Sequence, residues 1–187
     1  MSFDRSRRLY SRTGMLAGLA TLILLGGCQV RPLYSQAEGT GERLAALSFS
    51  DAGSRVEQVV RNHLIFLTSG GAGEALKPEY DVKLNAASTV SDVLDEDLST
   101  TGVPVPGRVV VSANYSISRV SDGQILKAGK REAVSLIDVS GQGFAKVRAI
   151  RDAENRASRE LAEFIRADLA IVLSREPKPQ PPQTWQK

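Results

Sequence analysis

The sequence predicts an α+β fold in which two helices pack on one face of a roughly four-stranded mixed or antiparallel sheet. Three observations predict it. Apolar residues recur at helical spacing in two separate segments. Residues 80–86 alternate between apolar and polar, as in a strand with one solvent-exposed face. Asp122-Gly123 separates two long strand-like segments, 108–120 and 125–139, and this dipeptide is typical of a hairpin.

The first half of the domain is predicted as a short strand followed by a helix. Residues 44–49 form an apolar run with the length of a strand. Ser54 and Glu57 then form a capping box, in which each side chain satisfies a free backbone N–H at the helix start. Gly70-Gly71 ends the helix. Its apolar stripe consists of Val56, Val59, Val60, His63, Leu64 and Leu67.

The second half is predicted as three strands and a long helix. Residues 92–107 contain an acidic patch and two prolines, and they are predicted as a long connection between strands. The last helix begins at Phe144 or Ala149 and ends at Ser174. Its apolar stripe consists of Ile150, Ala153, Ala157, Leu161, Phe164, Ile165, Leu169, Val172 and Leu173.

The N-terminal segment has the pattern of a bacterial lipoprotein signal. Four arginines precede an apolar run, 14–25, which at about 12 residues is shorter than the ~20 needed to cross a bilayer. Gly26-Gly27 precedes Cys28, the only cysteine. We therefore expect cleavage before Cys28 and acylation of its thiol, which anchors the protein to a membrane. An ordinary signal peptide with an unrelated cysteine, or a short uncleaved anchor, is the alternative. Arg7-Arg8 loosely resembles a twin-arginine export signal.

The predicted organisation is a signal peptide at 1–27, a lipidated tether at 28–43, a single domain at 44–175 and a disordered proline-rich tail at 176–187. Without the leader, the chain carries equal numbers of basic and acidic residues, so its charge does not support a nucleic-acid partner. No aspartate follows Cys28, and this favours the periplasmic side of the outer membrane over the inner membrane.

The residue inventory gives no support for an enzyme, and no cofactor is expected besides the covalent lipid. His63 is the only histidine and belongs to an apolar stripe, and Cys28 is expected to be acylated. This excludes Cys/His catalysis and metal sites rich in His or Cys. Residues 70–73 follow a helix and lack the lysine of a phosphate-binding loop. A hydrolase built on a pair of carboxylates stays open in principle.

Binding surfaces are the remaining candidates for function. The strand cluster consists of Lys127, Lys130 and Arg131, on the last predicted strand. The helix-start cluster consists of Lys146, Arg148 and Arg151, near the start of the last helix. Either cluster suits the phosphate or carboxylate groups of an anionic lipid, and either suits equally a solvated charged face. An exposed strand edge is a further candidate, because an unpaired edge can accept another chain or a ligand.

Four segments of the chain resemble the lipopolysaccharide-assembly lipoproteins of the LptE family, and the order of the predicted elements agrees with that family. The segments are 28–34, 60–64, 144–145 and 152–162. The resemblance implies a fold of two helices on a four-stranded sheet. It implies a non-enzymatic protein that plugs the lumen of the outer-membrane β-barrel LptD, assists its assembly, binds lipopolysaccharide and helps deliver it to the outer leaflet. By position, the helix-start cluster is the candidate for that lipid contact. An accessory lipoprotein of a lipid-trafficking ABC transporter is the alternative.

Overall fold

The computed structural model describes residues 39–92, 105–139 and 142–177. Predictions for Cys28, the signal peptide, most of the tether and the tail beyond Pro177 therefore lie outside the described residues. The elements, in chain order, are α2 (Thr40–Ala45), β1 (Leu47–Phe49), α3 (Arg55–Ser69), β2 (Tyr80–Asp92), β3 (Val105–Arg119), β4 (Ile125–Val139) and α4 (Gly143–Ser174). None of the helices in these ranges is both long and apolar enough to cross a membrane.

The four strands form one mixed sheet in the order β1-β2-β3-β4. β1 pairs with β2 in parallel, and the other two pairings are antiparallel. The β3–β4 connection is the predicted hairpin: Gly123 adopts a left-handed φ of 70°, and its N–H donates to the carbonyl of Arg119 at 2.8 Å. The predicted fold class is confirmed.

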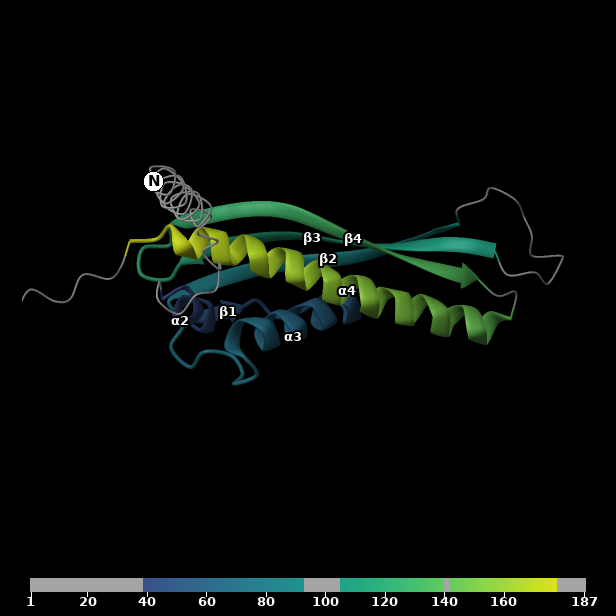
Figure 1. Ribbon diagram of the computed structural model, residues 1–187, viewed down its shortest axis with the longest axis horizontal. Helices are drawn as coiled ribbons and strands as arrows, with labels where there is room; N and C mark the ends of the chain where they lie inside the picture. The colour runs from purple at the N-terminus through teal and green to yellow at the C-terminus, as the bar shows by residue number, and fades with distance from the viewer. Residues whose placement is uncertain (1–38, 93–104, 140–141, 178–187) are drawn as a thin grey trace, which may run out of the picture. The chain divides into compact units, whose positions relative to one another are not determined.

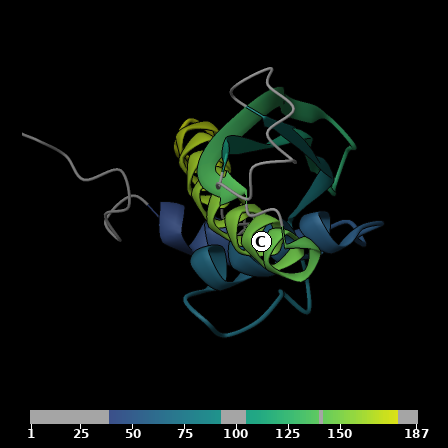
Figure 2. The same cartoon turned by 90° about the vertical axis from the view of Figure 1, so that its right-hand side faces the viewer.

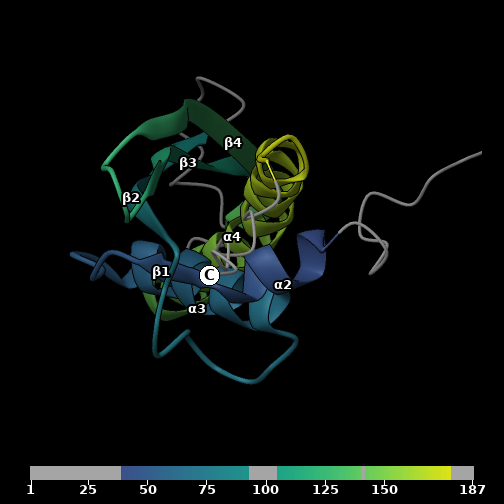
Figure 3. The same cartoon turned by 90° about the vertical axis from the view of Figure 1, so that its left-hand side faces the viewer.

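Both long helices pack on the same face of the sheet, α3 against β2 and α4 against β3 and β4 (Figure 1). The two end-on views show the same arrangement, with the curved sheet on one side and the helices on the other (Figures 2 and 3). Alternate strand residues, such as Val82, Val109 and Val111, are fully buried beneath the helices. Opposite them, Leu161, Ile165 and Leu169 of α4 are also fully buried. Burial of each such side chain contributes about 1.5–3 kcal/mol.

Helix α3 begins with the predicted capping box, in a slightly shifted form. Ser54 Oγ accepts a hydrogen bond from the N–H of Glu57 at 3.2 Å. The Glu57 carboxylate reaches back to the N–H of Gly53 at 3.3 Å, one residue earlier than the predicted partner. The helix ends at Gly70, whose left-handed φ of 63° a side chain would disfavour.

The prediction of a strand over 44–49 is wrong in its first part. Residues Thr40–Ala45 form the helix α2, which includes the last residues assigned to the tether, and only Leu47–Phe49 are extended. The reason is tertiary. Arg43 is almost fully buried, and its guanidinium donates to the carbonyls of Leu173 at 2.5 Å and Glu176 at 2.9 Å. The Leu173 carbonyl lies in the last turn of α4 and the Glu176 carbonyl just after it. Contact with this distant segment therefore stabilises α2, whose own sequence has no helical apolar pattern.

Candidate functional site

A buried carboxylate with three partners links α4 to the sheet. Asp168 of α4 is only 5% exposed. Its carboxylate accepts hydrogen bonds from Tyr115 Oη at 2.5 Å, from Lys127 Nζ at 3.0 Å and from Arg131 Nε at 2.7 Å and Nη2 at 2.9 Å. We call these four residues the Asp168 cluster. Two cations surround one carboxylate, so both Lys127 and Arg131 have a protein partner.

The pleat of the sheet brings these groups together. Lys127, Gly129 and Arg131 are alternate residues of β4, and they share the face of the sheet that α4 covers. Tyr115 lies directly opposite Gly129 in the β3–β4 register. Asp168 belongs to the buried side of α4, next to Leu169. The cluster therefore joins three elements that are far apart in the sequence.

Gly129 leaves the space that the Tyr115 ring occupies. A Cβ atom added at Gly129 would lie 2.9 Å from Tyr115 Oη and 3.0 Å from Cζ of the same ring. Atoms do not approach a Cβ this closely, and the Asp168 hydrogen bond holds the ring's far end in place. The absence of a side chain at position 129 is thus a requirement for the Tyr115–Asp168 contact.

The electrostatics of the cluster favour the charged form of Asp168. Hydrogen bonds from Arg131, Tyr115 and Lys127 hold the pKa of the Asp168 carboxyl well below its ordinary value, against the opposing effect of burial. Burial, followed by the hydrogen bond to Asp168, raises the pKa of the Tyr115 hydroxyl far above its ordinary value. The bond to Asp168 also raises the pKa of Arg131. At neutral pH Asp168 and Arg131 are therefore ionised and Tyr115 is protonated.

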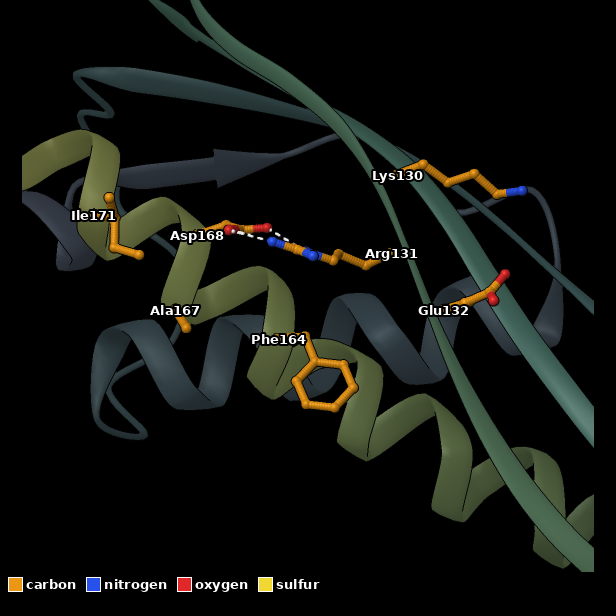
Figure 4. Close-up of a pocket in the computed structure, with 7 residues that line it drawn as sticks. All are labelled: Lys130, Arg131, Glu132, Phe164, Ala167, Asp168 and Ile171. Carbon is orange, nitrogen blue, oxygen red and sulfur yellow. Dashed lines mark hydrogen bonds and ion pairs between the residues drawn. The ribbon is translucent and has the colours of Figure 1, made fainter.

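A groove of about 570 Å³ runs beside this cluster, between β4 and α4 (Figure 4). Figure 4 shows Arg131 reaching across to Asp168, whereas Lys130 and Glu132 point away from α4. Phe164 lines the groove on the helix side and is 43% exposed. Phe164 thus belongs to the predicted apolar stripe of the last helix but is not buried like its neighbours in that stripe, because it faces the groove at the flank of the sheet.

The helix-start cluster has a different environment. Lys146, Arg148 and Arg151 are exposed on the first turns of α4, and no hydrogen bond or ion pair among the described residues involves their side chains. The first turn of α4 contains no acidic residue. Phe144 and Val147 lie among these cations and are 79% and 48% exposed. By helical spacing, Phe144, Val147, Arg148 and Arg151 share one exposed side of α4, whereas Lys146 lies on the opposite side.

The structure thus separates the six basic residues that the sequence singled out. Lys127 and Arg131 are bound to Asp168, Lys130 lies on the other face of β4, and no side chain in the described ranges pairs with the helix-start cluster on α4. Sequence reasoning missed Asp168, Tyr115 and Gly129. Asp168 left a signal, since it interrupts the predicted apolar stripe of the last helix.

The other candidates for chemistry are the single histidine and possible clusters of metal-ligating side chains. His63 is partly exposed, and its ring stacks on Phe66 with the centroids 6.4 Å apart. The part of the chain that the structure describes contains no group of His, Cys, Asp and Glu arranged to hold a metal ion.

Comparison with known proteins finds likeness in structure alone. No family model and no curated protein matches the chain. A crystal structure of a proposed lipoprotein from Caulobacter crescentus CB15 is 18% identical, with a TM-score of 0.58 over 74% of this chain and 98% of that one. A minor lipoprotein from Acinetobacter baumannii is 14% identical, with a TM-score of 0.49 over 72% and 94% of the two chains. The rare lipoprotein B of Shewanella oneidensis is 15% identical, with a TM-score of 0.45 over 67% and 92%. The Caulobacter protein shares the fold of this chain.

Proposed function

We propose that the protein is an outer-membrane lipoprotein, anchored through Cys28 on the periplasmic side, that plugs and helps assemble an LptD-like β-barrel and assists lipopolysaccharide delivery. One observation carries the proposal. The chain, whose sequence predicts a lipoprotein signal before Cys28, folds into two long helices on one face of a four-stranded sheet, which is the arrangement that the resemblance to the LptE family implies. The proposed role depends on surfaces that contact the barrel and the lipid, and it requires no catalytic residue.

The uncovered face of the sheet supports a plug. It carries small, mostly uncharged polar residues on the two central strands, including Asn85, Thr89, Ser112, Asn114 and Ser116. The lumen of an outer-membrane barrel is polar, so a plug must present a surface that tolerates polar neighbours and water. A face of short side chains also allows close approach to a barrel wall.

The helix-start cluster is the surface that we assign to lipopolysaccharide. Lys146, Arg148 and Arg151 can pair with its phosphates, because no described carboxylate occupies them. The exposed Phe144 and Val147 offer apolar contact beside the charges. Lys127 and Arg131 are poorer candidates, since a phosphate would have to displace Asp168.

Co-purification tests the proposed partner. The full-length protein, extracted from envelope membranes in mild detergent, is expected to carry with it a large outer-membrane β-barrel in equal amount. Recovery of an ABC transporter complex instead would support the alternative function and contradict the proposal. A Cys28→Ala variant serves as the control for anchoring. In cells without the barrel, we expect it to leave the membrane fraction, and continued membrane association there would contradict lipidation.

A second experiment tests the lipid contact. Replacement of the helix-start cluster by glutamine is expected to weaken binding of purified lipopolysaccharide roughly tenfold or more, because three charge pairs are removed. The matched control replaces three exposed basic residues elsewhere, Lys77, Lys83 and Arg159, by glutamine. Equal losses in both triple variants would show a general charge effect and would contradict the assigned surface.

A further inference from the structure

The two edges of the sheet differ in how far their backbone groups are hydrogen-bonded. Next to β1, the edge of β2 is closed by serine side chains. The N–H of Leu84 donates to Ser50 Oγ at 3.0 Å, and Ser54 Oγ donates to the carbonyl of Ala86 at 3.4 Å. Within the described ranges, no strand pairs with the outer edge of β4. Near the C-terminal end of β4, the Arg156 guanidinium donates a hydrogen bond to the carbonyl of Leu136. An open edge of this length is a template for another strand.

The sequence of β4 is complementary to itself when it is reversed about Arg131. In an antiparallel pairing of two β4 strands centred on Arg131, Lys130 of one copy lies opposite Glu132 of the other, and the reverse pair forms at the same time. Opposite charges placed directly across two strands stabilise their pairing. The two Arg131 side chains meet near the axis, but each is already bound to the Asp168 of its own copy.

The same axis also matches the exposed apolar residues of α4. Residues 130–132 of β4 and Phe164, Ala167, Asp168 and Ile171 of α4 line the same groove, so these helix residues lie beside the centre of the strand pairing. Phe164 and Ile171 are 43% and 36% exposed, lie two turns apart and flank this level. A two-fold axis makes the helices antiparallel, so Phe164 of one copy faces Ile171 of the other. Two independent patterns, one charged and one apolar, thus share one symmetry axis.

We propose that a second copy of this chain binds along the β4 edge, forming a two-fold dimer with a continuous sheet in the protein that is free of its barrel partner. The Lys130–Glu132 pairs set the strand register, and Phe164 and Ile171 cover one another beneath the sheet. This inference goes beyond the proposed function, because the complex with a barrel would contain the separated monomer.

Charge reversal tests the register. The full-length acylated protein, prepared in detergent without the barrel, is measured by light scattering with the detergent mass subtracted. We expect a dimer for the wild type. Lys130→Glu and Glu132→Lys should each place like charges opposite one another and weaken dimerisation by roughly tenfold or more. The double variant, with both reversals, restores opposite charges and should restore the dimer. Lys83→Glu, an exposed reversal on β2, is the matched control and should remain dimeric.

A crosslink tests the axis separately. Ala167 lies between Phe164 and Ile171 on the groove, so Ala167→Cys is expected to give a covalent dimer with a short thiol crosslinker, whereas Arg159→Cys, exposed on the same helix, should not. Circular dichroism establishes that each variant is folded. A wild type that stays monomeric up to ~100 µM would overturn the proposal, since specific dimers commonly form well below this concentration. A double variant that remains monomeric, or a dimer that Ala167→Cys does not crosslink, would overturn it as well.

Discussion

The strand cluster and the helix-start cluster look alike in the sequence, with three cations within a few residues in each, yet they have different roles in the fold. In the strand cluster, Lys127 and Arg131 bind the carboxylate of Asp168, which belongs to α4 and lies at least 37 residues later in the chain. In the helix-start cluster, no carboxylate of the described residues pairs with the three cations, because Asp152, four residues after Arg148, pairs with Arg156 instead. The comparison teaches that a basic cluster becomes a structural ion pair or an open binding surface according to what another element places opposite it.

The strongest test of this difference is Asp168→Asn. The change keeps the size of the side chain and removes the charge, so Lys127 and Arg131 lose their partner beside a buried amide. We expect the free energy of unfolding to fall by roughly 2–4 kcal/mol, less than for a fully buried pair because Arg131 is half exposed. Urea denaturation of the wild type and the variant measures this difference in the free energy of unfolding. Glu163→Gln, on the exposed side of α4, is the control and should cost under about 0.5 kcal/mol. Equal effects of the two changes would show that the cluster has no special role in stability.

Acid should weaken the same contact. The folded protein holds the pKa of Asp168 below its unfolded value, so the carboxylate stabilises the fold above about pH 4 and this stabilisation is lost as the pH falls further. We therefore expect the stability gap between wild type and Asp168→Asn to stay constant between about pH 5 and 8 and to narrow below about pH 4. Denaturation curves across this range measure the gap. A gap that stays constant down to about pH 2 would show that ionisation of Asp168 does not support the fold.

A smaller effect is expected at Gly129. Gly129→Ala places a methyl group against the Tyr115 ring, which must shift and lengthen its bond to Asp168. We expect a loss of about 1–3 kcal/mol, as for other overpacked sites. Gly143→Ala is the control, because an added Cβ there has no neighbour within 4 Å. Thermal unfolding of both variants measures the difference. If Gly129→Ala proves as stable as the control, the Tyr115 contact is not constrained by position 129.

The parts of the fold that depend on local chemistry could be predicted from the sequence, and the parts that depend on distant contacts could not. Ser54 with Glu57 and Asp122 with Gly123 act within a few residues, so the helix start and the hairpin were predicted correctly. Helix α2 depends on Arg43 reaching the end of α4, 130 residues away, and was missed.

The candidate site shows the same limit. The sequence identified the cations Lys127 and Arg131 but not the carboxylate that binds them. Only the placement of α4 over β4 decides that Asp168 and these cations meet, and Gly129 carries no signal without the position of Tyr115. Asp168 could have been suspected as a charge within an apolar stripe, but its partners could not have been chosen among the chain's many basic residues.

The helix-start cluster should give the smallest change in stability. Replacing Lys146, Arg148 and Arg151 by glutamine removes exposed charges without described partners, so the free energy of unfolding should change by less than about 0.5 kcal/mol. Relief of mutual repulsion among three cations and loss of side-chain packing oppose one another, which keeps the sum small. Urea denaturation beside Asp168→Asn makes the comparison direct. A loss as large as that of Asp168→Asn would mean that these cations support the fold, and a fall in lipopolysaccharide binding by the same variant would then reflect unfolding. A stable variant with weakened binding would instead assign the open cluster to recognition and the paired cluster to structure.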